Sequence, residues 1–136
     1  MGLLIDTSLF IALERAGVPL SALLDQVGSQ PVAISAITAS EILHGVHRAD
    51  SALRRGRRER FVEAVLETVP VLPFTLEVAR IHAQIWADLE MRGQTIGAND
   101  IVIAATALAH NLTVLTGNIR HFERVAGLKV VVAPSS

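Results

Sequence analysis

Three carboxylates and two neutral polar side chains stand where the chain could do chemistry. Asp6 directly follows the apolar run LLI, and Glu41 lies in the first turn of a helix-forming segment. Asp100 opens a nearly uncharged helix-forming run, while Thr116 ends the run LTVLT and Asn118 follows it. Carboxylates gathered in a partly desolvated cleft would repel one another strongly. A hard divalent cation relieves that repulsion, and oxygen-only ligands suit Mg²⁺ or Mn²⁺.

Helix capping is the alternative explanation for the same residues. Side-chain oxygens at the starts of predicted helices can accept free N–H groups, and the candidates are Asp6, either Asn99 or Asp100, and Asn118. Thr38 and Glu41 have the spacing of a capping box, in which Glu41 bonds the backbone N–H of Thr38. For each residue considered alone, helix capping is the favoured interpretation. For the residues considered together, a metal site is favoured.

Other site classes lack the residues that they need. The chain has no cysteine, and of its five histidines only His44 and His47 are close in sequence, so zinc is disfavoured. A haloacid-dehalogenase-type phosphatase needs Asp where Ser8 stands, and a phosphoacceptor receiver domain needs Asp where Phe74 ends a predicted strand. A glycine-rich dinucleotide turn and a G-x-S-x-G nucleophile elbow are also absent.

Short β-branched runs alternate with longer helical patterns along the chain. The predicted strands are residues 3–5, 32–35, 69–74, 112–116 and 128–132. The predicted helices are residues 7–15, 19–29, 38–49, an arginine-rich helix that ends near Thr68, 75–93, 101–109 and 118–125. This alternation is typical of an α/β sandwich around a mainly parallel sheet, in which ligands bind at the carboxyl ends of the strands. Because Thr106 is the only polar residue from 101 to 109, we expect both faces of that helix to be buried.

The composition predicts a single domain, residues 1–136, in the cytoplasm. The net charge is −1, and half of the residues are apolar. No apolar stretch approaches the roughly 20 residues that span a bilayer. The first ten residues lack the basic region of a signal peptide, and the absence of cysteine fits a reducing compartment.

Four stretches resemble, in order and spacing, the motifs of PIN-domain ribonucleases, specifically the VapC toxins of bacterial type II toxin–antitoxin pairs. They are LLIDTSLFIAL (3–13), ITASEILHGVHRA (37–49), IGANDIVIAATAL (96–108) and VLTGNIRHFERVAGLKV (114–130). The resemblance covers essentially the whole chain. It implies a PIN-like sandwich with a mainly parallel five-stranded sheet and helices on both faces. It also implies an endoribonuclease that hydrolyses RNA phosphodiester bonds with water activated by Mg²⁺, or by Mn²⁺ as a substitute.

The resemblance assigns a role to each of the five polar residues. Asp6 and Asp100 become the principal metal ligands, and Glu41 completes the acidic triad. Thr116 occupies the family's Ser/Thr position, and Asn118 stands where many members have a fourth Asp. The loss of that charge leaves the number of bound ions open. The alternative is a catalytically weak PIN module that acts mainly as the antitoxin's partner in a repressor complex.

The partners implied are an RNA substrate, a second copy of the chain in a homodimer, and a VapB-type antitoxin. DNA would be contacted only through the antitoxin, and no membrane is involved. The apolar helical segments 8–13 and 37–46 either form the groove for an antitoxin helix or belong to the core.

An arginine-rich segment, residues 48–60, carries six arginines and two acids, and so has a net charge of +4. Within it we predict that four residues contact the RNA backbone: Arg54, Arg55, Arg57 and Arg58. A solvated helix face is an equally good explanation. Trp86 falls in an amphipathic helical pattern, which favours core or dimer packing over base stacking.

Overall fold

The protein is described here by a computed structural model that covers residues 2–133. One sheet contains five strands: β1 (Leu3–Ile5), β2 (Val32–Ser35), β3 (Val71–Leu72), β4 (Thr113–Thr116) and β5 (Val130–Val132). The strand order is β3-β2-β1-β4-β5, and every pairing between neighbours is parallel. The prediction of a mainly parallel five-stranded sheet is therefore confirmed.

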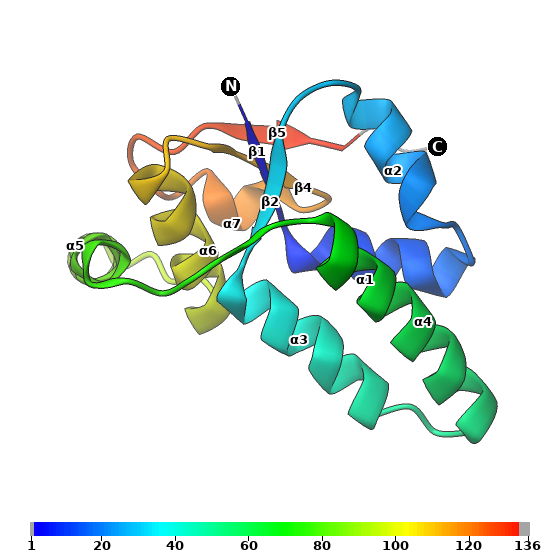
Figure 1. Cartoon of the computed structure of the whole chain (residues 1–136). Helices are drawn as coiled ribbons and strands as arrows, with labels where there is room; N and C mark the ends of the chain where they lie inside the picture. The colour runs from blue at the N-terminus through cyan, green and yellow to red at the C-terminus, as the bar shows by residue number, and fades with distance from the viewer. Residues whose placement is uncertain (1, 134–136) are drawn as a thin grey trace.

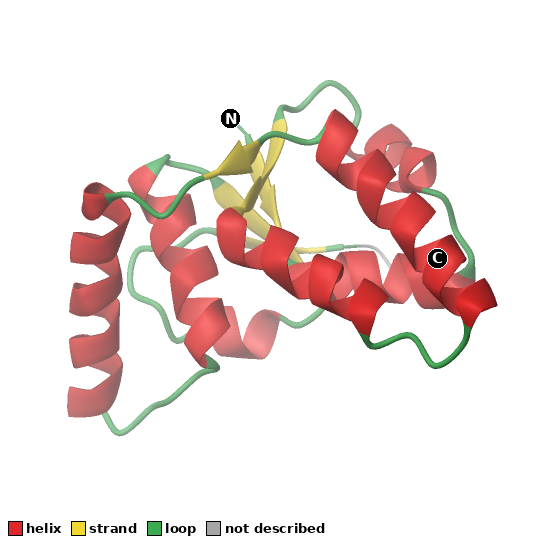
Figure 2. Cartoon of the chain, turned by 60° about the horizontal axis from the view of Figure 1, so that its bottom comes forward, coloured by secondary structure: helices red, strands yellow, loops and turns green. Residues whose placement is uncertain are grey.

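Within residues 2–133, seven helices connect and cover the strands (Figure 1). They are α1 (Thr7–Ala16), α2 (Leu20–Val27), α3 (Ala36–His47), α4 (Ala52–Thr68), α5 (Leu76–Met91), α6 (Ala98–Ala109) and α7 (Ile119–Phe122). Helices α3 and α4 form a hairpin that extends away from the sheet, and the sheet lies between helices on its two sides (Figures 1 and 2). Among the described residues, no helix is long and apolar enough to cross a membrane.

Alternate residues of the central strands face two separate apolar clusters. Leu4 and Val114 pack with α5, α6 and α7. Their neighbours Leu3, Ile5 and Leu115 pack on the other face, with α1, α2, α3 and α4. Burial on both faces is what a parallel sheet with crossover helices requires, and it explains why these strands are apolar throughout. The helix that follows Asp100 is buried around most of its circumference, as predicted.

Several predicted boundaries are wrong. The strand expected at residues 69–74 is reduced to Val71–Leu72, because Pro70 and Pro73 on either side lack the N–H that a ladder needs. The last strand and the last helix are also shorter than predicted, at 130–132 and 119–122. None of these changes moves a polar residue away from the carboxyl edge of the sheet.

Candidate active site

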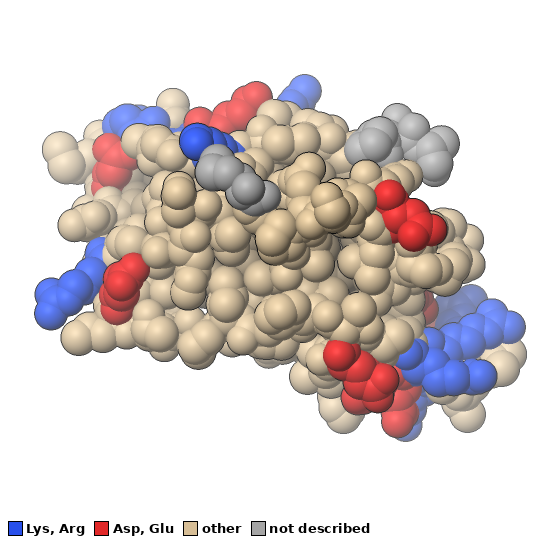
Figure 3. All heavy atoms as spheres, turned by 45° about the horizontal axis from the view of Figure 1, so that its top comes forward, with Lys and Arg blue, Asp and Glu red and all other residues tan. Residues whose placement is uncertain are grey.

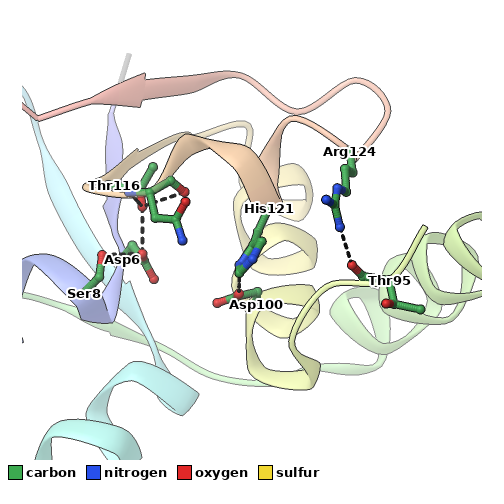
Figure 4. Close-up of polar contacts among 8 residues, drawn as sticks. Asp6, Ser8, Thr95, Asp100, Thr116, His121 and Arg124 are labelled. Atoms are coloured by element: carbon green, nitrogen blue, oxygen red, sulfur yellow. Dashed lines mark hydrogen bonds and ion pairs between the residues drawn. The ribbon is translucent and has the colours of Figure 1, made fainter.

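Asp6 is anchored at the carboxyl end of the central strand β1. Asp6 is only 5% exposed, and its backbone N–H donates to the carbonyl of Leu115 at 2.9 Å. One carboxylate oxygen, Oδ2, accepts hydrogen bonds from the hydroxyls of Ser8 at 2.7 Å and Thr116 at 2.8 Å (Figure 4). Bonds from two directions to a charged acceptor hold the carboxylate in one orientation.

Glu41 projects from the second turn of α3 toward the segment that follows Asp6. Its Oε1 accepts a 2.7 Å hydrogen bond from the hydroxyl of Thr7, a buried residue whose hydroxyl also lies 3.0 Å from that of Thr38. The helix begins at Ala36, and the hydroxyl of Ser35 accepts the N–H of Thr38. The capping box expected of Thr38 and Glu41 is therefore wrong, and Glu41 is free for another role.

Asp100 lies in the first turn of α6, and its side chain is 26% exposed. Its Oδ2 is 3.3 Å from Nδ1 of His121, which α7 contributes (Figure 4). Gly97 precedes the helix, and a Cβ at this position would come within 3.3 Å of the same oxygen. The carboxylate thus occupies a confined position between two chain segments.

Thr116 and Asn118 follow one another at the end of β4. Thr116 is fully buried, and besides bonding Asp6 its hydroxyl oxygen accepts the backbone N–H of Asn118 at 2.9 Å. The residue Asn118 is exposed. Thr116 therefore orients Asp6, whereas Asn118 is exposed just beyond the end of β4.

Helix capping does not explain the remaining polar residues. Asp6 and Asn118 occupy the N-cap positions of α1 and α7, but neither side chain accepts a capping hydrogen bond. Gly97 is the N-cap of α6, so Asp100 lies inside the helix, where it caps nothing. The capping alternative is wrong for each of these residues, and another reason is needed for their position.

Like charges converge on Asp100. Burial raises the pKa of this carboxyl above its ordinary value of 3.8, and the carboxylate of Asp6 raises it further. Glu41 contributes in the same direction, whereas the hydrogen bond and charge of His121 lower it. Acids from β1, α3 and α6 are therefore close enough to act on one another in a partly desolvated place, an arrangement that costs free energy unless a cation is present.

The donor atoms of this site fit a hard cation, but the number of carboxylates that could bind one ion directly is small. Carboxylate oxygens are the ligands that Mg²⁺ prefers, and Mg²⁺ is commonly held by one or two carboxylates while it keeps several waters. Within residues 2–133, no three Asp, Glu or His side chains are close enough together to hold one ion. The side chains thus fit an ion bound by few carboxylates and by water, and the described arrangement does not form a direct three-carboxylate cage.

Three supporting residues were missed by the sequence analysis. The hydroxyl of Ser8 donates to Asp6, and the hydroxyl of Thr7 donates to Glu41. Hydroxyl residues are common at the start of a helix, so their positions in the sequence do not indicate these contacts. His121 was set aside because the histidines are scattered along the chain. Its proximity to Asp100 depends on how α7 packs against α6, which no local pattern reveals.

A groove of about 460 Å³ lies between α1, α3 and α4, and Glu41 is the one candidate acid among its lining residues. Apolar side chains from the three helices line it: Phe10, Ile11, Ile42, Phe61 and Val62. Asn99, from the first turn of α6, also lines it, and Arg54 and Arg58 are among its charged residues. The helical segments 8–13 and 37–46 therefore contribute both to the core and to an open groove.

Most of the arginine-rich segment forms the first turns of α4, whereas Arg48 caps the end of α3, and its arginines differ in their contacts. Arg58 pairs with Glu14 of α1 at 3.2 Å and donates to the carbonyl of Gly45 at 2.9 Å. Arg54 pairs with Asp50 at 3.3 Å on the exposed surface. In Figure 3, positive and negative side chains lie together at the corner that the α3–α4 hairpin occupies in Figure 1.

Two other residues singled out from the sequence are exposed. Arg55 and Arg57 both face solvent on α4. Trp86 is 53% exposed on α5, where it makes an edge-to-face contact with His82, which in turn contacts Phe74. Core packing of Trp86 is therefore wrong, and dimer packing stays a prediction.

Comparison with known proteins places this geometry in a family. The family model described as PIN domain matches residues 3–128. Ribonuclease VapC1 of Rickettsia felis is 40% identical over 136 residues, which is 99% of this chain and 98% of that protein. The tRNA(fMet)-specific endonuclease VapC of Salmonella typhimurium is 34% identical over 97 residues, covering 71% of this chain and 70% of the relative.

Solved structures agree with the sequence comparison. The crystal structure of DNA-bound VapBC from Salmonella typhimurium contains a chain that is 27% identical, with a TM-score of 0.85 and coverage of 97% of this chain and 98% of that one. The fold is thus shared over nearly the full length. The chain belongs to the PIN domain family, and its relatives within that family are the VapC ribonucleases.

Proposed function

We propose that this protein is a divalent-cation-dependent endoribonuclease that acts as the toxin of a type II toxin–antitoxin pair. One observation supports the proposal: three carboxylates from separate segments lie at the carboxyl edge of the sheet, where the charges of Asp6 and Glu41 both raise the pKa of Asp100. Such an arrangement is unfavourable in the absence of a cation and favourable in its presence.

Asp6 and Asp100 are the proposed ligands of a Mg²⁺ ion, for which Mn²⁺ can substitute. Glu41, expected from the resemblance to be a third ligand, accepts a bond from Thr7, and we propose that it would hold water around such an ion. A bound divalent cation would supply an activated water molecule and would neutralise negative charge on the scissile phosphate.

The other residues of the site act on the carboxylates and on the substrate. Thr116 and Ser8 hold Asp6 in the orientation that a ligand requires. Asn118, at the open surface, is placed to donate a hydrogen bond to a phosphate oxygen of the substrate. Because water is the nucleophile in this scheme, the RNA 2′-OH takes no part. The products should carry 5′-phosphate and 3′-hydroxyl ends.

RNA is the proposed substrate, and the α4 arginines are proposed to contact its backbone. Arg55 and Arg57 are exposed, so their guanidinium groups can reach phosphates without breaking a buried interaction. Arg54 would have to exchange a surface ion pair, which is worth little. Arg58 is different because it joins α4 to Glu14 and to Gly45, so we assign it a mainly structural role.

The apolar groove is the proposed binding site of a VapB-type antitoxin. A tail that followed it would reach Glu41 and Asn99 and would block access of RNA to the site. The related Salmonella complex is described as DNA-bound VapBC, which supports DNA contact through the antitoxin. We expect the complex to act in the cytoplasm, where RNA and operator DNA are both present.

A homodimer is also proposed, with the exposed face of α5 as its contact. Trp86 and Phe74 are each about half exposed on this side, and exposed aromatic groups of this size favour burial by a partner. Changing Trp86 to Glu should convert dimer to monomer in sedimentation experiments without lowering the melting temperature of the monomer. A Trp86→Glu protein that still sediments as a dimer would remove α5 from the interface.

The test of activity is cleavage of total RNA by purified protein with Mg²⁺ and with EDTA, followed by mapping of the new 5′ ends. We expect cleavage only with the cation, and 5′-phosphate ends that a 5′-phosphate-dependent ligase can join. Products with 2′,3′-cyclic phosphate would refute the proposed chemistry. Absence of cleavage in both conditions would favour the alternative, a weak PIN module whose main role is antitoxin binding.

A further inference from the structure

One short stretch of chain contacts both principal carboxylates. Thr116, at the end of β4, bonds Oδ2 of Asp6 at 2.8 Å. Five residues later His121 lies with Nδ1 3.3 Å from Oδ2 of Asp100. Figure 4 shows the two contacts side by side, with β4 and α7 bridging them. Asp6 and Asp100 come from distant parts of the sequence, so this stretch fixes one relative to the other.

His121 is well placed to orient a carboxylate. Its side chain is 44% exposed, against 26% for Asp100, so the pair lies at the rim of the site. With its proton on Nδ1, the imidazole donates to the oxygen of Asp100 that also faces Gly97. This contact is the side-chain hydrogen bond found at the Asp100 carboxylate among residues 2–133, and it joins α6 to α7.

A second contact ties the same stretch to the start of α6. Arg124, two residues after α7, donates from Nη1 to the carbonyl of Thr95 at 2.7 Å (Figure 4). Thr95 belongs to the connection from α5 to α6, and Arg92 in this connection donates in return to the carbonyl of Arg124. The chain just after α7 is therefore bonded at two points to the connection that leads into α6, the helix that carries Asp100.

We propose that His121 is a positioning residue that holds Asp100 in its ligand orientation, with Arg124 fixing the chain segment behind it. This inference rests on the proposed function, because it assumes that Asp100 binds a divalent cation. Partners that orient a metal ligand typically contribute 10- to 100-fold to metal affinity or activity. His121 needs no contact with the substrate for this role, since it acts through Asp100.

The test compares three substitutions of His121. His121→Ala removes the donor, His121→Asn keeps an N–H donor near the place of Nδ1, and His121→Gln places the donor near that of Nε2. Two quantities are measured: Mn²⁺ affinity of the RNA-free protein by electron paramagnetic resonance, and kcat and KM for RNA cleavage at saturating Mg²⁺. Circular dichroism and melting temperature establish that each variant is folded.

The expected result is a weakening of Mn²⁺ affinity by about 10-fold or more in His121→Ala and His121→Gln, with kcat lowered and KM for RNA little changed. His121→Asn should restore affinity to within about threefold of the original protein. Arg124→Gln should cause a smaller loss of about two- to threefold, because it acts one step further from Asp100.

Matched controls separate positioning from general effects. His110→Ala removes an exposed histidine at the other end of α6, and Arg120→Gln removes an exposed arginine on α7. Neither should change Mn²⁺ affinity or kcat. Should His121→Ala fail to fold, the Asn and Gln variants decide the matter, because equal behaviour of the two overturns the inference.

The outcomes distinguish this inference from the proposed function. A wild-type protein that cleaves RNA, together with a His121→Ala variant that matches His110→Ala in both measurements, would overturn the positioning role alone. A wild-type protein that neither binds Mn²⁺ nor cleaves RNA would overturn the proposed function and the inference together.

Discussion

The carboxyl edge of the sheet and the helix α4 both gather like charges, but the two regions hold them differently. Asp6 is buried and accepts bonds from two hydroxyls, and Glu41 is bonded to a buried threonine. On α4, Arg55 and Arg57 face solvent, and Arg54 pairs with an exposed acid one turn away. The acids are confined by tertiary contacts, whereas most of the arginines stay in water.

The difference shows which kind of charge cluster is the better indication of a functional site. Like charges on an exposed helix are screened by solvent and salt, so they accumulate at little cost. Like charges in a partly desolvated site destabilise the protein, and such an arrangement survives for a reason other than stability. The acidic edge is thus the stronger indication of function, and the arginines need direct measurement.

The largest expected effect comes from neutralising one carboxylate of the edge. Asp100→Asn keeps the size of the side chain but removes a proposed ligand, and RNA cleavage should fall by at least about 100-fold, beyond the usual loss from an indirect partner. Circular dichroism should be unchanged. Asp25→Asn, on the exposed surface of α2, is the control. Retention of activity in Asp100→Asn would remove this residue from the site.

A smaller effect is expected from removing a hydroxyl that orients the acids. Thr116→Val keeps the shape of a fully buried side chain but deletes the 2.8 Å bond to Asp6. Cleavage should fall about 10-fold. The free energy of unfolding should fall by about 1 to 3 kcal/mol, as for a hydrogen bond to a charged group. Thr113→Val in the same strand is the matched control, and an equal effect of the two changes would contradict the assigned role.

The arginine helix should respond in proportion to the number of free charges removed. Changing Arg54, Arg55 and Arg57 to Gln should weaken RNA binding at low salt and should reduce the salt slope by up to about 0.7 for each phosphate that is no longer neutralised. Arg58→Gln should instead lower the free energy of unfolding, by about 1 kcal/mol, since it breaks a partly buried pair. An unchanged salt slope in the triple variant would leave the segment as a solvated helix face.

The smallest expected effect concerns stability and pH in the cation-free protein. Because the pKa of Asp100 is raised in the folded state, the folded protein binds this proton more tightly than the unfolded chain does. Stability contributed by the protonated form is therefore present at low pH and is lost as the pH rises from about 3.8 through the raised value. Differential scanning calorimetry should show that the melting temperature of Asp100→Asn falls less steeply than that of the original protein over this pH range. Added Mg²⁺ should offset the fall in the melting temperature of the original protein.

Local sequence patterns were sufficient for the fold class and for the identity of the candidate acids. The alternation of β-branched runs with helical periods predicts a parallel sheet, and Asp6 and Thr116 stand at strand ends that such a sheet must bring to one edge. Periodicity and strand ends are both local features, because they depend on residues that are close together in the sequence. Boundaries were predicted less well where Pro70, Pro73 and Ser35 decide them.

Tertiary structure alone decided which polar residues support one another. Capping was open for Asp6 and Asp100 until the structure showed that neither side chain makes a capping hydrogen bond, and metal binding stays a proposal. The contact of His121 with Asp100 and the pairing of Arg58 with Glu14 join segments 21 and 44 residues apart. Contacts across such separations depend on how helices pack against the sheet, and helix packing is set by the whole core rather than by any short stretch of sequence.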